Sequence, residues 1–441
     1  LFNQVVVPSQ LRRLRLMELL NWTEDALNRV DRTRFFDQFE EARAVQYFYE
    51  PFLDRFDPDL REELGVWYTP EEIVEYQVRR VDTVLREELD IDDGLASEDV
   101  IVLDPCCGTG AYLVETLRVI AERLREQGTG ALTAETLREA VTERIYGFEI
   151  LTAPYVVAHL QIGLFLAQMG APLGGGEAGE VDGADDEDRA GVFLTNALTG
   201  WEPEEATGEK RTFPEFKAER LAAEQVKQEE PILVILGNPP YSGYAGVAVG
   251  EERTLSDAYR ETEEAPEPQG HGLNDLYVRF YRMAERQIVE NTEKGVVSYI
   301  SNYSWLDGLS HTGMRERYLD VFDRLWIDDM NGDKYRTGKT TPAGDPDPSV
   351  FSTDYSRIGI QVGTAVATLC RRDDSASDGD EDDGEQADDD GAQLLYRQFW
   401  GTEKRDDLLA TADLSDAEGY DLIDPPLELG LPFMPRATGA D

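Results

Sequence analysis

Hydrophobic residues between positions 99 and 372 alternate between short continuous runs and segments in which apolar positions recur at helical spacing. Short apolar runs predict buried strands, and helical spacing predicts helices with one buried side. Strands are predicted at residues 100–103, 145–148, 232–236, 295–300, 324–328 and 361–370, and helices are predicted to begin at Gly110, Ala153, Asn274 and Thr312. This alternation predicts an α/β fold with a doubly wound, Rossmann-like sheet.

The pattern of apolar residues changes before residue 66 and after residue 372, so further regions are predicted on both sides of the α/β part. In residues 1–65, Leu11, Leu14, Met17 and Leu20 recur at helical spacing and predict an N-terminal helical extension. One folded domain is predicted for residues 66–372. Residues 373–391 are acidic and of low complexity, so we expect a disordered linker there. Residues 392–441 regain some apolar pattern and are expected to begin an incomplete C-terminal region.

A helix is predicted at the start of the folded domain, where the order Thr69, Pro70 and Glu72 matches a capping box. In this motif the threonine caps the helix, the proline takes the first helical position and the glutamate takes the third. A second additional helix is predicted at residues 133–144.

The charge of the chain is unusual for its size. Among 441 residues, 42 are Lys or Arg and 90 are Asp or Glu, which gives a net charge of −48, and only seven of the basic residues are Lys. Such a surface opposes ordinary binding to DNA phosphates. Either the protein never meets nucleic acid, or it is adapted to molar salt, where the Debye length falls to about 3 Å. Acidic excess with scarce lysine favours a halophilic protein, so the charge does not exclude DNA.

Cysteine usage and hydropathy narrow the class of protein. The three cysteines are Cys106, Cys107 and Cys370, with no spacing typical of metal ligands, so we expect neither a metal site nor disulfides. No run of about 18 apolar residues predicts a membrane span. With no charged-then-apolar leader at Leu1, the sequence favours part of a cytoplasmic protein.

The sequence Asn238-Pro239-Pro240-Tyr241 directly follows the apolar run at 232–237. At a strand end, the Asn238 side-chain oxygen and the Pro239 carbonyl could accept both hydrogens of a planar amine or amide and draw its nitrogen towards a tetrahedral, nucleophilic shape. The prolines fix φ and remove donors, which keeps the carbonyl aimed. Tyr241 would offer a flat face for stacking. The alternative is an ordinary Pro-Pro turn with a packed tyrosine.

A cofactor site is predicted where the run at 100–103 leads into Asp104, Pro105, Cys106 and then Gly108 and Gly110. The two glycines allow positive φ and close backbone approach to a ligand, at the sheet edge where doubly wound folds bind nucleotides. The turn lacks the third glycine of a dinucleotide site and the lysine of a phosphate loop. An acidic strand end followed by Gly-x-Gly instead indicates S-adenosyl-L-methionine, with Asp104 facing its sulfonium or ammonium group.

Two further strand ends carry polar side chains. Glu149, followed by Ile150, could accept hydrogen bonds from both ribose hydroxyls of the cofactor, or could be an exposed strand-end acid. Asn196, followed by Ala197, could bind the adenine of the cofactor, or could simply form a turn.

Taken in order, residues 68–70, 104–110, Glu149, Asn196 and 238–241 resemble the N6-adenine DNA methyltransferases in which the cofactor motif precedes Asn-Pro-Pro-Tyr and target recognition comes last. The resemblance covers roughly residues 66–372. It is strongest to the methyltransferase part of type ISP restriction–modification enzymes and related phage-defence methyltransferases.

The resemblance implies transfer of a methyl group from S-adenosyl-L-methionine to an adenine flipped out of double-stranded DNA. Asn238 and Pro239 would hold N6, Tyr241 would stack on one face of the base, and Phe351 would close the other unless it belongs to the core. Tyr68, Thr69 and Pro70 would line the methionine end of the cofactor.

Sequence specificity is expected to depend on a target-recognition region that continues beyond residue 392, or on a restriction or specificity subunit. Two alternatives stay open: a protein glutamine N5-methyltransferase, because an amide is also planar, and a non-catalytic subunit of a DNA-defence complex.

Overall fold

The computed structural model describes residues 68–128, 133–173, 189–201, 214–241, 251–352, 359–372, 391–412, 414 and 419–435, together with Met17, Trp22, Asn28 and Arg29. The predicted helical extension at 1–65, apart from those four positions, and the predicted linker at 373–390 lie outside the described residues.

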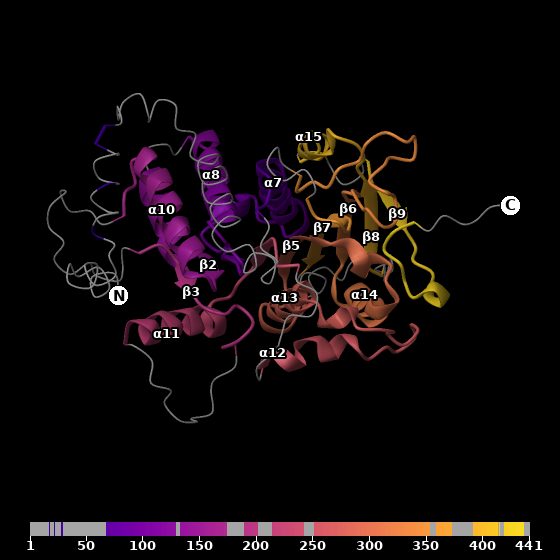
Figure 1. Ribbon diagram of the computed structural model, residues 1–441. Helices are drawn as coiled ribbons and strands as arrows, with labels where there is room; N and C mark the ends of the chain where they lie inside the picture. The colour runs from indigo at the N-terminus through magenta and orange to yellow at the C-terminus, as the bar shows by residue number, and fades with distance from the viewer. Residues whose placement is uncertain are drawn as a thin grey trace, which may run out of the picture.

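The described strands form a single sheet whose centre is parallel (Figure 1). Across the sheet the strands are β3 (Val192–Leu194), β2 (Ile145–Glu149), β1 (Val102–Asp104), β4 (Val234–Gly237), β5 (Gly295–Asn302), β7 (Thr364–Arg371), β6 (Arg324–Asp329), β8 (Gln393–Gln398) and β9 (Asp421–Ile423). The strands from β3 to β5 are parallel neighbours, whereas β7 runs antiparallel to both β5 and β6. The doubly wound α/β fold predicted from the sequence is thus confirmed.

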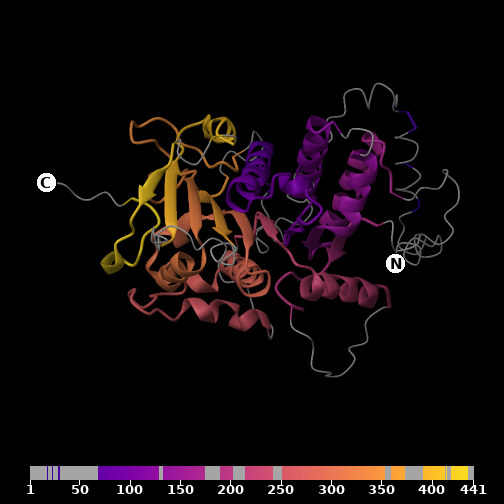
Figure 2. The ribbon, with the colours of Figure 1, turned by 180° about the vertical axis from the view of Figure 1, so that it is seen from behind.

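Helices cover both faces of this sheet (Figures 1 and 2). One face carries α7 (Glu71–Glu88), α8 (Ala111–Glu126), α9 (Thr133–Glu143) and α10 (Thr152–Gln168). The other carries α11 (Pro214–Glu229), α13 (Leu276–Glu285) and α14 (Thr312–Val321). Two short helices are α12 (Glu251–Thr254) and α15 (Lys404–Leu409), and α15 packs against α7.

Neighbouring residues of the strands contribute to different hydrophobic clusters, because side chains alternate between the two faces of a sheet. In β1, Val102 joins the cluster under α7 and α8, and Leu103 joins the cluster under α13. In β4, Val234 and Leu236 face the first cluster and Ile235 faces the second. The apolar runs of the sequence are continuous because both faces of these strands are covered.

The strand order reverses between β1 and β4. From β1 the chain continues through β2 to β3 on one side, whereas β4 and β5 lie on the other side. In doubly wound sheets the crevice beyond the carboxyl ends of the strands at such a point is the usual ligand-binding place. Asp104 ends β1, Glu149 ends β2 and Asn238 follows β4, so the candidate residues of the sequence gather there.

The C-terminal strands differ from the predicted division of the chain. Residues 392–441 were expected to begin a separate region, but β8 pairs with β6 along its full length and β9 pairs with β8. The sheet therefore continues past the predicted boundary at 372. The physical reason is that the apolar residues of β8, such as Leu394 and Tyr396, complete the core of this sheet. That a target-recognition region follows stays a prediction.

A buried polar cluster fastens these strands to α7. Asp328 of β6 accepts hydrogen bonds from the hydroxyls of Tyr76 and Tyr420, at 2.6 Å and 2.9 Å, and pairs with Arg397 at 2.5 Å. Arg397 also lies over the Tyr420 ring, 4.1 Å from its centroid. Breaking a buried ion pair leaves an uncompensated charge, which costs about 3–5 kcal/mol. This cluster therefore ties α7, β6, β8 and the start of β9 into one unit.

Two local predictions need correction. The predicted capping box is wrong, because α7 has Pro70 at its N-cap position and no side-chain capping hydrogen bond. The helix expected from Asn274 begins at Leu276, since residues Gly272–Asn274 form a 3-10 turn. Among the described helices, none combines the length and the apolar composition that crossing a bilayer would need.

Candidate functional site

The glycine turn after β1 has the backbone shape that its sequence predicted. Gly108 and Gly110 have φ of 54° and 88°, in the region where side chains are strained. Gly110 precedes the first residue of α8, and a Cβ there would lie 3.1 Å from Ala158 on α10. At Gly108, by contrast, a Cβ would meet no atom of the described residues within 4 Å. Gly110 therefore permits close packing of two helices, whereas no described residue crowds Gly108.

Asp104 has a buried carboxylate, and only one of its two oxygens accepts a hydrogen bond from a described residue. Its Oδ1 accepts a hydrogen bond from the Cys106 backbone N–H at 3.0 Å, which holds the turn through Pro105. Its Oδ2 is buried and has no hydrogen-bond partner in the described structure. Burial raises the pKa of Asp104 to about 7. A buried acceptor without a partner at this place fits a cationic ligand, which would favour the ionised carboxylate.

Glu149 binds backbone groups of two turns. Its Oε2 accepts from Gly108 N–H at 3.0 Å, and its Oε1 accepts from Leu151 N–H at 2.7 Å. Burial raises the pKa of Glu149, which these backbone donors oppose. A carboxylate has about four acceptor positions, so these backbone donors leave acceptor capacity for a hydroxyl. The next residue, Ile150, is 61% exposed despite its apolar side chain, as expected of a surface that a flat apolar group would cover.

Gly237 joins the two parts of the site and was not singled out in the sequence. Its φ is 154°, and a Cβ at this position would lie 2.7 Å from Asp104 Oδ1 and 3.3 Å from Cys106 Sγ. The missing side chain is therefore what lets β4 approach the glycine turn. A glycine directly before Asn238 is the signal that could have revealed this contact.

Asn238 is held by Thr69, from a segment 169 residues earlier in the chain. The Asn238 Nδ2 donates to Thr69 Oγ1 at 2.9 Å. The hydroxyl that was expected to cap a helix thus binds the candidate catalytic amide. Since an asparagine amide has one nitrogen and one oxygen, fixing the nitrogen also fixes the direction of the oxygen. Thr69 is 7% exposed and Pro70 is also buried, while Tyr68 is half-buried.

Tyr241 and Phe351 come together from segments on either side of β5. Their ring centroids are 5.8 Å apart and their planes meet at 82°, so one ring presents its edge to the other. The Tyr241 hydroxyl donates to the Ile300 carbonyl at 3.1 Å. Phe351 is 3% exposed and belongs to the small cluster that contains Ile73 and Val366. Core packing, the alternative for Phe351, is present in this structure.

The end of β3 forms a turn. The Asn196 side-chain oxygen accepts from Leu198 N–H at 3.0 Å, and the Ala197 carbonyl accepts from Trp201 Nε1 at 2.6 Å. Lys227, which no sequence pattern indicated, holds this turn from α11. Its Nζ donates to the carbonyls of Asn196 and Thr199, each at 2.8 Å. A cofactor contact of Asn196 stays a prediction.

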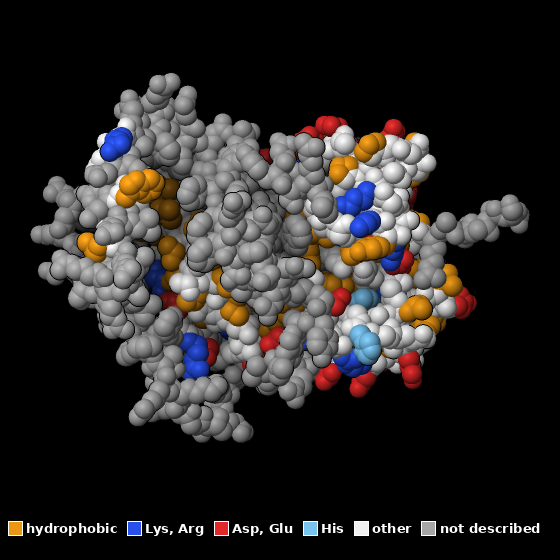
Figure 3. All heavy atoms as spheres, viewed as in Figure 1, with side chains coloured by type: hydrophobic (Ala, Val, Ile, Leu, Met, Phe, Trp, Pro, Cys, Tyr) orange, Lys and Arg blue, Asp and Glu red, His pale blue; other side chains and the backbone are white. Residues whose placement is uncertain are grey.

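Basic and acidic side chains both occur on the described surface. On the face shown in Figure 3, basic side chains form small separate groups, and acidic side chains lie mainly along the top and bottom edges of the right-hand part. Basic residues of α13 are paired within the chain: Arg279 with Glu252 at 2.5 Å, and Arg282 with Glu290 at 2.6 Å. Within the described ranges, no three His, Cys, Asp or Glu side chains come together as a metal site requires.

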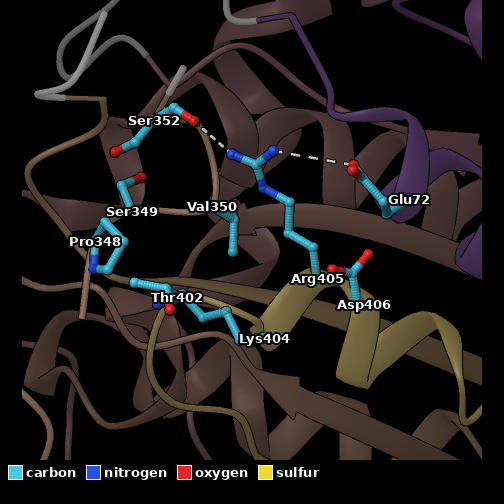
Figure 4. Close-up of a pocket in the computed structure, with 9 residues that line it drawn as sticks. All are labelled: Glu72, Pro348, Ser349, Val350, Ser352, Thr402, Lys404, Arg405 and Asp406. Carbon is cyan, nitrogen blue, oxygen red and sulfur yellow. Dashed lines mark hydrogen bonds and ion pairs between the residues drawn. The ribbon is translucent and has the colours of Figure 1, made fainter. Parts of the chain in front are cut away.

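A small polar pocket of about 210 Å³ lies next to Phe351, between the start of α7 and α15 (Figure 4). Arg405 reaches across it towards Glu72, at 4.0 Å, and donates to the Ser352 carbonyl at 2.5 Å. Because the arginine bonds to the residue that follows Phe351, it helps to hold the aromatic side of the site. No sequence pattern pointed to Arg405.

Known proteins share both the sequence pattern and the fold. Residues 42–169 match the family described as N-6 DNA Methylase. No curated protein matches the sequence.

Solved structures of restriction–modification enzymes superpose on most of the chain. A complex of DrdV with DNA is 24% identical, with a TM-score of 0.64, over 90% of this chain and 34% of that one. The ATP-dependent type ISP enzyme LlaBIII bound to DNA is 22% identical, with a TM-score of 0.65, over 88% and 23%. A nuclease-deletion mutant of the type ISP enzyme LlaGI, with a DNA substrate mimic, is 22% identical, with a TM-score of 0.64, over 90% and 29%.

The chain therefore spans about a third or less of the length of these enzymes. The sequence of residues 42–169 thus resembles the N-6 DNA methylase family, and the described part of the chain shares its fold with these restriction–modification enzymes.

Proposed function

We propose that the chain is the methyltransferase part of a restriction–modification or phage-defence enzyme that methylates N6 of adenine in double-stranded DNA. The observation that carries the proposal is the position of Asn238, which follows β4 directly beside the glycine turn after β1. Gly237 brings the candidate acceptor of the target nitrogen next to the candidate cofactor turn. The DNA-bound enzymes that share the fold support DNA as the substrate.

The residues at the glycine turn fit S-adenosyl-L-methionine. Asp104 Oδ2 is a buried acceptor that suits a cation, no described residue crowds Gly108, and Glu149 has acceptor capacity for a hydroxyl. Ile150 supplies exposed apolar surface for a flat ring. When bound, this cofactor would supply an electrophilic methyl group on a sulfonium.

At the other side of the junction, Asn238 Oδ1 and the Pro239 carbonyl would accept the two hydrogens of the adenine amine. Holding both hydrogens reduces delocalisation of the nitrogen lone pair into the ring, so that the pair becomes available for attack. Asn238 and Pro239 would thus hold the nitrogen with its lone pair free to take up a methyl group, and the amine would afterwards lose one proton to water. This sequence needs no general base for the attack itself.

Tyr241 would stack on the flipped adenine, with Phe351 on its other face. Two parallel rings that enclose a base lie about 7 Å apart, twice the usual carbon–carbon contact distance. In the present structure the rings lie 5.8 Å apart, edge to face. Phe351 must therefore turn or move when adenine enters, whereas Tyr241 is anchored by its hydrogen bond to Ile300.

The acidic surface sets the conditions under which DNA binding is expected. The net charge of −48 repels DNA at low salt. At molar salt the Debye length is about 3 Å, so this repulsion acts only at close range. Methyl transfer is therefore expected in molar KCl, in line with the halophilic interpretation.

The test is transfer of tritium from labelled S-adenosyl-L-methionine to unmethylated plasmid DNA in molar KCl, with the protein and its Asn238→Ala variant side by side. Label recovered as N6-methyladenine from the unaltered protein alone would support the proposal. Label found on glutamine side chains of protein would mean that the substrate is protein and not DNA. If the protein binds the cofactor but labels no DNA, with added target-recognition subunit or without, the proposed function is wrong.

A further inference from the structure

Behind Asn238 lies a row of buried polar side chains to which the proposed reaction assigns no chemical step. Its members come from the segment before α7, from α7, α8 and β5, and each is at most 7% exposed: Thr69, Gln77, Tyr112 and Ser298. Burying a polar group is costly unless it is hydrogen-bonded. Ser298, Gln77 and Tyr112 are joined by hydrogen bonds, and Thr69 is hydrogen-bonded to Asn238, so the row extends from the centre of the sheet to the candidate catalytic amide.

The direction of these hydrogen bonds can be followed from the sheet outwards. Gln77 Nε2 donates to the Ser298 carbonyl at 3.2 Å and lies 3.3 Å from the Ser298 hydroxyl oxygen. A backbone carbonyl can only accept, so the nitrogen of this amide must face β5 and its oxygen must face α8. That Oε1 accepts a hydrogen bond from the Tyr112 hydroxyl at 2.5 Å.

The hydroxyls that follow have only one hydrogen each, so the direction is passed on. Tyr112 gives its hydrogen to Gln77 and can only accept on its other side. On that side lies the Thr69 hydroxyl, which lowers the pKa of the Tyr112 hydroxyl against the larger rise that burial causes. Thr69 in turn can only accept from Asn238, and it does so from Nδ2 at 2.9 Å. A carbonyl of the sheet thus determines, through three side chains, which end of the Asn238 amide points at Thr69.

We propose that Gln77, Tyr112 and Thr69 are positioning residues that select the orientation of the Asn238 amide in which Oδ1 faces the target nitrogen. The two orientations of an asparagine amide have nearly the same shape, so packing alone discriminates poorly between them. The reversed orientation would present an NH₂ group to an amine, donor against donor. The inference rests on the proposed function, in which Asn238 accepts a hydrogen from the adenine.

The test is a double-mutant cycle between Tyr112→Phe and Asn238→Asp, measured as kcat for methyl transfer to DNA. In the presence of Asn238, Tyr112→Phe frees the Thr69 hydroxyl to donate, which allows the reversed amide. We expect kcat to fall on the order of five-fold, as for loss of one buried hydrogen bond, with the KM for DNA and the Kd for the cofactor unchanged. A carboxylate accepts on both sides, so in the Asn238→Asp background Tyr112→Phe should lower kcat no further.

Two results would overturn the inference. Equal losses from Tyr112→Phe in both backgrounds would mean that Tyr112 only supports packing. An unchanged kcat in the presence of Asn238 would mean that the direction is not transmitted. The matched control is Tyr318→Phe, which removes another buried tyrosine hydroxyl, bonded to Tyr259 at 3.2 Å on the far face of the sheet. This control should leave kcat unchanged.

A second measurement does not depend on catalysis. In protein labelled with ¹⁵N-asparagine, the side-chain amide signals of Asn238, assigned by their loss in Asn238→Ala, should shift in Tyr112→Phe and stay in place in Tyr318→Phe. Unshifted signals in Tyr112→Phe would reject the positioning role, even if Asn238→Asp had no measurable activity. If the signals shift in Tyr112→Phe but the unaltered protein methylates no DNA, the positioning role of the three residues stands and the proposed function is rejected.

Discussion

At the cofactor end of the site (Asp104, Gly108 and Glu149) the carboxylates bond to backbone N–H groups of adjacent turns, whereas at the target end (Asn238, Tyr241 and Phe351) positions depend largely on side chains from distant elements. Backbone donors are fixed once the strands pair. Side-chain contacts such as the edge-to-face pair of Tyr241 and Phe351 can rearrange. The cofactor end is therefore expected to be formed in advance, and the target end to adapt to the base.

The largest effect is expected where the two ends meet. Gly237→Ala places a methyl group 2.7 Å from Asp104 Oδ1, at a φ of 154°. Either β4 or the glycine turn must move, so cofactor affinity and methyl transfer should both fall by at least about ten-fold, as for a core position with no room for an added group. Isothermal titration calorimetry and the tritium assay would measure the two effects. Loss of transfer with unchanged affinity would contradict a shared junction.

Asp104→Asn should separate stability from binding. Burial raises the pKa of Asp104 from 3.8 to about 7. The folded protein therefore holds a proton that the unfolded chain releases between these values, so this group's contribution to stability is full below about pH 4 and is lost as pH rises towards 7. Above pH 7 the buried charge costs about 4 kcal/mol.

We thus expect Asp104→Asn to raise the free energy of unfolding at pH 8 but not at pH 4, in urea titrations of the protein without cofactor. The same change should weaken S-adenosyl-L-methionine binding about 100-fold at pH 8, because a cationic ligand loses its buried counter-charge. For the unaltered protein, affinity should increase from pH 6 to pH 8 as Asp104 ionises. Equal affinity at both pH values would remove Asp104 from the site.

Phe351→Leu should affect the target end alone. Stacking of a base on an aromatic ring contributes about 1–3 kcal/mol, so kcat/KM for DNA should fall roughly ten-fold while the Kd for the cofactor stays the same. Leucine keeps most of the packing volume that Phe351 fills beside Ile73 and Val366. A drop in thermal stability without loss of activity would assign Phe351 to the core alone.

The smallest effect is expected from Ile150→Ala at the cofactor end. Ile150 is 61% exposed, so its truncation should leave the free energy of unfolding nearly unchanged. If a flat ring of the cofactor covers Ile150, cofactor affinity should fall about three-fold, because part of the free energy of burying this apolar side chain is lost. Val156 on α10, which is 57% exposed, gives the control: Val156→Ala should not alter affinity.

The sequence predicted the parts of the molecule that depend on short stretches of chain. Strands β1, β2, β4, β5, β6 and β7, the glycine turn and the place of Asn238 all follow from apolar runs and turn residues within a few positions. Contacts between distant segments left no comparable signal. Thr69 fits a capping box as well as it fits a hydrogen bond to Asn238, and nothing near Lys227 or Arg405 indicates the carbonyls that they bind.

The boundary at 372 shows the same difference. Low complexity in residues 373–391 indicates a break in local pattern, and β8 can still join the sheet after it. Pairing partners of a strand are set by the whole fold, since the strand itself specifies only which of its faces is apolar.

The cluster around Asp328 has a consequence for how the protein is made. Arg397 donates to Tyr76 across 321 residues of chain, and Tyr420 lies 344 residues after the same tyrosine. Ribosomes add about 5–20 residues per second, so α7 waits on the order of a minute for the side chains that fasten it. During that time α7 rests only on its contacts with α8 and the central strands. If the proposed function holds, a nascent chain should therefore reach its full methyl-transfer rate only after synthesis has passed β9.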